Sequence, residues 1–124
     1  MRSTLSRLYA PLLGLALLLT LPMAAMAEKA DLSVLPHTKE GIEELNDQHI
    51  KELRRVERAC LAGAGGAAGA CVATDMESYM AGKASPELKA FHNALPLDQR
   101  YNSERPWAWV QGRFQSMGVI PKPE

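Results

Sequence analysis

Apolar residues recur every three or four positions between residues 38 and 61, which is the spacing of one face of an α-helix. The residues on this face are Ile42, Leu45, His49, Leu53, Val56 and Cys60, with Ile50 beside them. The charges of the segment are sorted, because acidic residues fill its first half and basic residues its second half. This order complements the helix dipole, so a solvated face is a sufficient explanation for it. The pattern predicts a long amphipathic helix.

Three shorter segments carry helical signals after residue 71. The start of the first is predicted from Thr74 and Glu77, which have the spacing of a capping box. The start of the second is predicted from Ser85 and Pro86, as N-cap and first helical residue, and Gly118 marks the end of the third. The predicted ranges are 75–81, 86–95 and 107–117. Because no segment alternates as a strand would, we predict an all-α fold, a small bundle of three to four short helices.

The first 27 residues follow a different pattern, with Arg2 and Arg7 ahead of an apolar run and a small-residue site that ends at Ala27. These are the three parts of a secretory signal peptide. A retained membrane anchor is the alternative, but two prolines shorten the apolar run and favour cleavage. We therefore predict a signal peptide at 1–27, a flexible segment at 28–37 and a helical domain at 38–124. The protein would be periplasmic or secreted, with no stable membrane insertion after cleavage.

Cys60 and Cys71 are the only cysteines of the chain. In an exported protein such a pair is typically oxidised, and two cysteines alone cannot fill a structural zinc site. The bridge would staple the long helix to the next one as an αα-hairpin. Residues 62–70 between them are glycines and alanines, three of which match a relaxed dinucleotide-binding fingerprint. That fingerprint requires a preceding strand, so we expect a flexible loop and no cofactor site.

Charge and motifs exclude several function classes. The 14 basic and 14 acidic residues balance, and no basic patch suits a phosphate backbone, so nucleic acid is not an expected partner. The chain has neither a nucleophile elbow nor a zinc-hydrolase motif, and we assign no catalytic or metal-binding residue. The alternative function is a periplasmic copper-binding protein, with His49, Met76 and Met80 as soft and imidazole ligands and His37 or His92 as further candidates. An enzyme without a recognisable motif is the third reading.

Two tryptophans near the C-terminus suggest a surface for a partner. On a helix, Trp107 and Trp109 point about 200° apart, so both cannot face one small core. Trp107 shares a face with apolar residues, whereas Trp109 lies beside Arg113 and Ser116. Either a second element covers Trp109, or Trp109, Arg113 and Ser116 form a candidate partner surface. We expect an exported, non-enzymatic accessory, inhibitor or chaperone-like protein that binds a protein partner in the export compartment.

Overall fold

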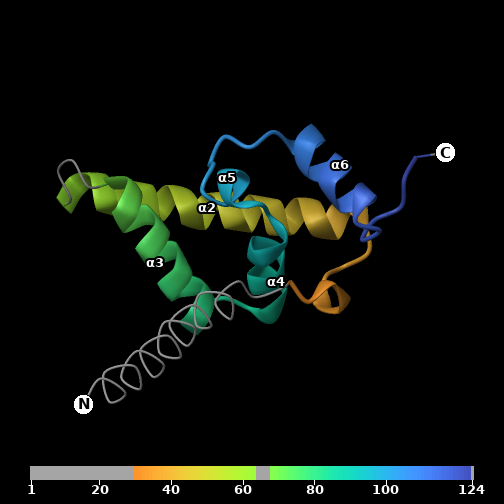
Figure 1. Ribbon diagram of the computed structural model, residues 1–124, viewed down its shortest axis with the longest axis horizontal. Coiled ribbons are helices and arrows are strands. Elements are labelled where there is room, and N and C mark those ends of the chain that lie inside the picture. Colours follow the sequence, from red (N-terminus) through yellow and green to blue (C-terminus); the bar gives the residue numbers. More distant parts are fainter. Residues whose placement is uncertain (1–29, 64–67, 124) are drawn as a thin grey trace, which may run out of the picture.

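The fold is all-helical in the computed structural model, which describes residues 30–63 and 68–123 (Figure 1). Its elements are η1 (Leu32–Val34), α2 (Lys39–Gly63), α3 (Ala68–Gly82), α4 (Pro86–Ala94), α5 (Leu97–Arg100) and α6 (Trp107–Ser116). Within these ranges no helix combines the length and the apolar character needed to cross a bilayer. The predicted all-α bundle is confirmed. The predicted signal peptide lies outside the described residues and stays a prediction.

Helix α2 is the spine of the molecule, and α3, α4 and α6 all contact it (Figure 1). Its 25 residues span about 38 Å at 1.5 Å per residue. The side chains that it buries are Ile42, Leu45, Asn46, His49, Leu53, Val56 and Cys60. Six of these seven form the face expected from the sequence, so the amphipathic pattern correctly placed this helix against the core. The seventh buried residue, which the predicted face did not include, is the polar Asn46.

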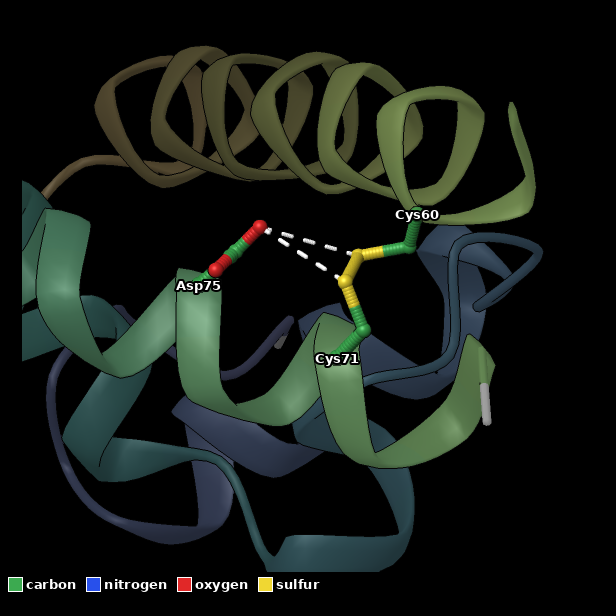
Figure 2. Close-up of a disulfide and its surroundings, with 3 residues drawn as sticks. All are labelled: Cys60, Cys71 and Asp75. Atoms are coloured by element: carbon green, nitrogen blue, oxygen red, sulfur yellow. Dashed lines mark hydrogen bonds between the residues drawn. A yellow bond between two sulfur atoms is a disulfide. The ribbon is translucent and has the colours of Figure 1, made fainter. Parts of the chain in front are cut away.

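A disulfide joins the C-terminal part of α2 to the first turns of α3, and the predicted αα-hairpin is confirmed. The sulfurs of Cys60 and Cys71 are bonded, with 5.8 Å between the two Cα atoms (Figure 2). The prediction for α3 itself was wrong at its start, because the helix begins at Ala68 and Thr74 lies inside it. Alanine is the strongest helix former and surrounds Cys71, so the helix extends back through part of the expected loop. Residues 64–67 of that loop lie outside the described range.

Two of the later helices begin at the predicted residue and end within one residue of the predicted position. The Ser85 hydroxyl accepts a hydrogen bond from the Leu88 N–H at 3.1 Å, and Pro86 is the first residue of α4. Helix α6 ends at Ser116, and Gly118 follows two residues later with a φ of +78°, a conformation that favours glycine. The interval between these helices includes the single-turn helix α5.

The segment ahead of α2 packs against the domain in its described part, residues 30–37. The Leu35 side chain is 3% exposed and belongs to the core. The His37 ring contacts the Val119 carbonyl oxygen through Nδ1 at 2.9 Å, which ties this segment to the C-terminal end of the domain. A Cβ atom on Gly41 would lie 2.6 Å from Cβ of Pro36, so the close approach of the segment to α2 requires glycine. Residues 30–37 thus contact the domain at Leu35 and His37, and the flexibility of the segment stays a prediction.

Candidate functional site: a buried histidine relay

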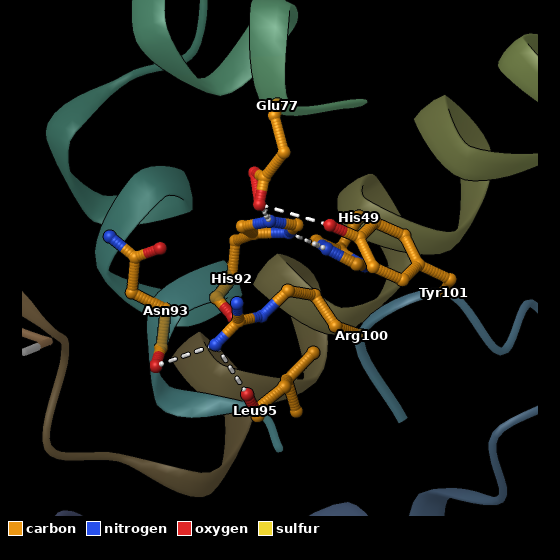
Figure 3. Close-up of polar contacts among 7 residues, drawn as sticks. All are labelled: His49, Glu77, His92, Asn93, Leu95, Arg100 and Tyr101. Carbon is orange, nitrogen blue, oxygen red and sulfur yellow. Dashed lines mark hydrogen bonds and ion pairs between the residues drawn. The ribbon is translucent and has the colours of Figure 1, made fainter. Parts of the chain in front are cut away.

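Two histidines meet in the centre of the core, one from α2 and one from α4 (Figure 3). His49 and His92 are both 0% exposed, and Nε2 of His49 lies 2.9 Å from Nδ1 of His92. His49 occupies the apolar face of α2, and His92 lies in the last turn of α4. The Phe91 ring packs 5.5 Å from the His49 ring, so the pair is enclosed by apolar side chains as well as by polar ones. Buried polar groups of this kind are expected to be fully hydrogen-bonded.

On one side, the histidine pair reaches the surface through a glutamate from α3. The carboxylate of Glu77 lies 2.9 Å from Nε2 of His92, and the Glu77 side chain is 47% exposed. The Tyr101 hydroxyl donates to the same carboxylate at 3.0 Å (Figure 3). Glu77, which the sequence suggested as part of a helix cap, instead links α3 to α4 and to the end of α5.

On the other side, the pair is closed by a buried arginine. Arg105 is 3% exposed, and one of its NH2 groups lies 2.9 Å from Nδ1 of His49. Its Nε donates to the side-chain oxygen of Asn46 at 3.0 Å, and its second NH2 group donates to the Gln99 carbonyl at 2.7 Å. The guanidinium also lies 5.7 Å from the centre of the Phe91 ring. All of these partners are uncharged.

The donors and acceptors along this chain are determined by its two ends. A guanidinium can only donate, so Nδ1 of His49 accepts from Arg105 and the His49 proton sits on Nε2. That proton is donated to Nδ1 of His92, whose own proton therefore sits on Nε2 and is donated to Glu77. Both imidazoles are neutral in this arrangement. We call the four residues Arg105, His49, His92 and Glu77 the histidine relay.

The environment of the relay favours the neutral histidines. Burial lowers the pKa of His49 well below its usual 6.5, and the positive charges of Arg105 and Arg100 add to this effect. Burial also lowers the pKa of His92, although the Glu77 carboxylate opposes the shift.

The arginine and the tyrosine at the two ends of this network are shifted as well. Burial lowers the pKa of Arg105 to about 10, which leaves it charged at neutral pH. Burial, reinforced by the hydrogen bond to Glu77, raises the pKa of Tyr101 to about 12.

A second arginine holds the end of α4 in place beside the relay. Nε of Arg100 donates to the His92 carbonyl at 3.1 Å, and its NH2 group donates to the carbonyls of Asn93 and Leu95 at 3.3 Å and 2.8 Å (Figure 3). These carbonyls lie at the C-terminal end of α4, where a cation is favoured by the helix dipole. Arg100 thus positions His92 through the backbone.

The relay is arranged to hold protons rather than a metal ion. The four ring nitrogens of His49 and His92 all have hydrogen-bond partners within the network. Met76 and Met80, proposed with His49 as copper ligands, are 0% and 4% exposed and belong to the core. His37 is turned to the Val119 carbonyl. The copper-binding reading therefore finds no free imidazole nitrogen on His49.

A different cluster brings potential metal ligands together at the disulfide (Figure 2). Within the described residues, the one group of three such ligands consists of Cys60, Cys71 and Asp75. Oδ2 of Asp75 lies 3.6 Å and 3.8 Å from the two sulfurs. Metal binding by cysteine needs a thiolate, and these sulfurs are bonded to each other. The cluster in its oxidised form is therefore a structural contact.

The predicted surface at the C-terminal helix is partly buried. Trp107 and Trp109 are both half-buried and both pack against the core, which agrees with the alternative that other parts of the fold cover Trp109 in part. The Arg113 guanidinium donates to the Ala94 carbonyl at 3.1 Å, while its Nε is buried without a hydrogen-bond partner. Ser116 is exposed. A partner role for Trp109, Arg113 and Ser116 stays a prediction.

Exposed cations gather on the C-terminal half of α2, on a surface that we call the basic ridge. It consists of Lys51, Arg54, Arg55 and Arg58, all of them exposed. A hollow of about 330 Å³ lies on one side, between the ridge and Tyr79 of α3. A second hollow of about 260 Å³ lies on the other side, next to Ile50. Lys51 and Arg58 line both hollows.

The relay was not found by sequence reasoning, because its members come from four separate parts of the chain. His49 on an apolar helix face was the one local signal, and it was read as a core residue or a copper ligand. Arg105 and Glu77 gave no sign of their roles, since only the tertiary fold brings them to the histidines.

Comparison with family models, curated proteins and solved structures finds no match to this chain.

Proposed function

We propose that the protein is an exported, non-enzymatic helical protein that binds a short acidic segment of a partner protein on the basic ridge. The observation that carries this proposal is that the charged groups of Lys51 and Arg58 are exposed and unpaired among the described residues. Both are exposed, both line the two hollows, and neither has a hydrogen-bond or ion-pair partner among the described residues.

The other two cations of the ridge are already engaged within the chain. Arg55 forms an ion pair with Glu52 on the same helix, and the Arg54 guanidinium donates to the Ser103 carbonyl at 3.2 Å. These contacts occupy both guanidinium groups within the chain. Lys51 and Arg58 stand seven residues apart, which is two helical turns or about 10 Å. A segment of three or four extended residues has the length to reach both.

The hollow between α2 and α3 supplies an apolar contact beside these charges. Its lining includes the half-buried Tyr79 ring and Leu88, together with Lys51 and Arg58. Exposed ion pairs contribute only about 0.2–1 kcal/mol each, so charge alone would give weak binding. An apolar side chain placed in the hollow would add hydrophobic burial. The best ligand is therefore an acidic segment with one apolar residue.

The neighbouring charges disfavour longer anionic ligands. The N-terminal half of α2 carries Glu40, Glu43, Glu44 and Asp47, all exposed. Asp47 lies one turn from Lys51, so a nucleic acid or a flat anionic membrane that covered the ridge would also approach these carboxylates. Like charges held close together repel. A short acidic segment avoids this repulsion.

The test uses a fluorescent peptide of alternating Glu and Asp with one central Leu. We expect Lys51→Glu with Arg58→Glu to weaken its binding at least tenfold in fluorescence anisotropy. The control Lys39→Glu with Lys122→Glu changes the net charge equally, away from the ridge, and should change the affinity less than twofold. Raising the salt from 50 to 300 mM should weaken binding of the unmodified protein.

Three results would contradict the proposal. One is the absence of peptide binding by the unmodified protein at low salt. Another is equal loss in the ridge variant and its charge-matched control, since that would mean a response to net charge alone. The third is tighter binding to phosphatidylglycerol vesicles or to duplex DNA than to the peptide.

A further inference from the structure

We infer that the protein has a second, acid-dependent binding activity, in which the histidine relay opens, α3 moves away from α2 and α4 beyond the disulfide, and the apolar face of α3 takes apolar segments of unfolded protein chains. This activity uses a different surface from the basic ridge and does not depend on the function proposed above.

The first step is that the relay cannot accept a proton and keep its hydrogen bonds. In His49 the nitrogen that can accept a proton is Nδ1, which faces the Arg105 guanidinium. In His92 it is also Nδ1, which faces the Nε2–H of His49. A proton on either nitrogen would therefore meet a donor. The charged groups around the pair are Arg105 and Arg100 on one side and Glu77 on the other, with the Tyr101 hydroxyl on the same carboxylate. A cationic His49 faces arginine and no carboxylate.

The second step concerns what holds α3 in place. Glu77 is its polar link to the rest of the domain, through His92 of α4 and through Tyr101. Cys71, in the first turns of α3, is bonded to Cys60 of α2. Along α3, Glu77 lies between Cys71 and the C-terminal end of the helix at Gly82. Opening the relay would release the middle of α3, while the disulfide keeps its first turns attached to α2.

The third step is the surface that such a movement uncovers. The side chains by which α3 enters the core are Val72, Met76 and Met80, with 8%, 0% and 4% exposure. Methionine is flexible and polarisable, and it fits apolar partners of many shapes. The face of α2 opposite them carries further buried apolar residues. Apolar segments of unfolded chains match this surface, because it offers adaptable apolar contacts and no fixed polar pattern.

The test follows exposure of the apolar face as pH is lowered from 7.5 to 4.5. We expect the fluorescence of bis-ANS to rise at least fivefold before the far-ultraviolet circular dichroism falls, because the helices stay formed. Over the same range the protein should suppress light scattering by an aggregating, reduced and carboxymethylated model protein. No suppression, or dye binding only after the helices are lost, would overturn the inference.

A matched pair of variants connects the activity to the relay. His49→Gln places an amide N–H where Nε2–H was, so donation to His92 remains while one titratable group is lost. We expect its dye-binding midpoint to move to lower pH by at least half a unit. His37→Gln removes a histidine outside the relay and should leave the midpoint unchanged. Equal behaviour of the two variants would overturn the inference.

A measurement on the unmodified protein covers the case in which His49→Gln fails to fold at neutral pH. The ring C–H resonances of His49 and His92 report their protonation directly in NMR spectra. We expect both to titrate in the pH range in which dye binding rises. Rings that stay neutral throughout the rise would overturn the inference, since opening would then have another cause.

Discussion

The histidine relay makes the free energy of unfolding depend on pH in a defined direction. Both histidines are neutral in the folded state, because burial lowers their pKa values. In the unfolded chain they take up protons near their usual pKa of 6.5. Below this pH the unfolded state binds more protons than the folded state, so stability falls as pH falls. Above it both states are neutral at these sites, and their contribution is constant.

The magnitude follows from the same linkage. Between pH 7.5 and 5.5, a histidine that stays neutral only when folded removes about 1.4 kcal/mol of stability. His49, with burial and two nearby arginines against its charged form, should give this full amount. His92 should give less, because Glu77 favours its charged form. We expect a total loss of about 1.4–2.8 kcal/mol, which is a large part of the about 5–15 kcal/mol typical of a folded protein.

Urea unfolding followed by circular dichroism at several pH values measures this loss. The linear extrapolation should show a plateau above pH 7 and a decline towards pH 5.5. His49→Gln should reduce the decline to that of His92 alone. His37→Gln, the control outside the relay, should keep the full decline. A flat profile between pH 7.5 and 5.5, or a rise on acidification, would refute the assignment of two neutral buried histidines.

Three further predictions test the remaining parts of the fold. Arg105→Met should lower the free energy of unfolding by about 2–4 kcal/mol, because buried acceptors lose their donor. The same substitution should raise the pKa of His49 in an NMR titration, and an unchanged titration would show that Arg105 does not act on His49. Reduction of the Cys60–Cys71 bridge should cost about 3 kcal/mol in urea unfolding, and equal stability of the two forms would show that the loop adds no constraint. Trp107→Ala and Trp109→Ala should destabilise the domain by similar amounts, about 2–3 kcal/mol, because both rings are half-buried against the core. If only Trp107→Ala lowered the free energy of unfolding, a surface role for Trp109 would be favoured again.

The helices were predictable from sequence to the extent that their signals are local. The amphipathic spacing of α2 and the Ser85 cap of α4 depend on residues within a few turns of one another, and both are confirmed. The capping box at Thr74 is equally local, yet it is overridden. The chain around Cys71 gains a disulfide and strong helix formers, so the helix starts earlier. The disulfide and the helix-forming residues around Cys71 thus outweigh the weak local preference for a helix start at Thr74.

The candidate site was not predictable for a related reason. Its hydrogen bonds join residues that are separated by as many as 59 positions, such as Asn46 and Arg105. A pattern search along the chain sees only a histidine on an apolar face and a charged residue in a polar linker. Burial of Arg105 depends on how the segment after α5 crosses α2, which no local spacing encodes. Relays of this kind become visible only when the helices are in place.

The relay also explains how this core holds a charged arginine with no carboxylate in contact. Burying an isolated charge costs desolvation free energy, and removing one partner of a buried pair leaves this cost without compensation. Here the negative charge sits at the surface on Glu77, and two polarisable neutral imidazoles carry the hydrogen bonding from it to Arg105. Hydrogen bonds in such a chain strengthen one another. The arrangement is satisfied in one protonation state only, so the contact that aligns α2, α3 and α4 at neutral pH is also the contact that acid should break first.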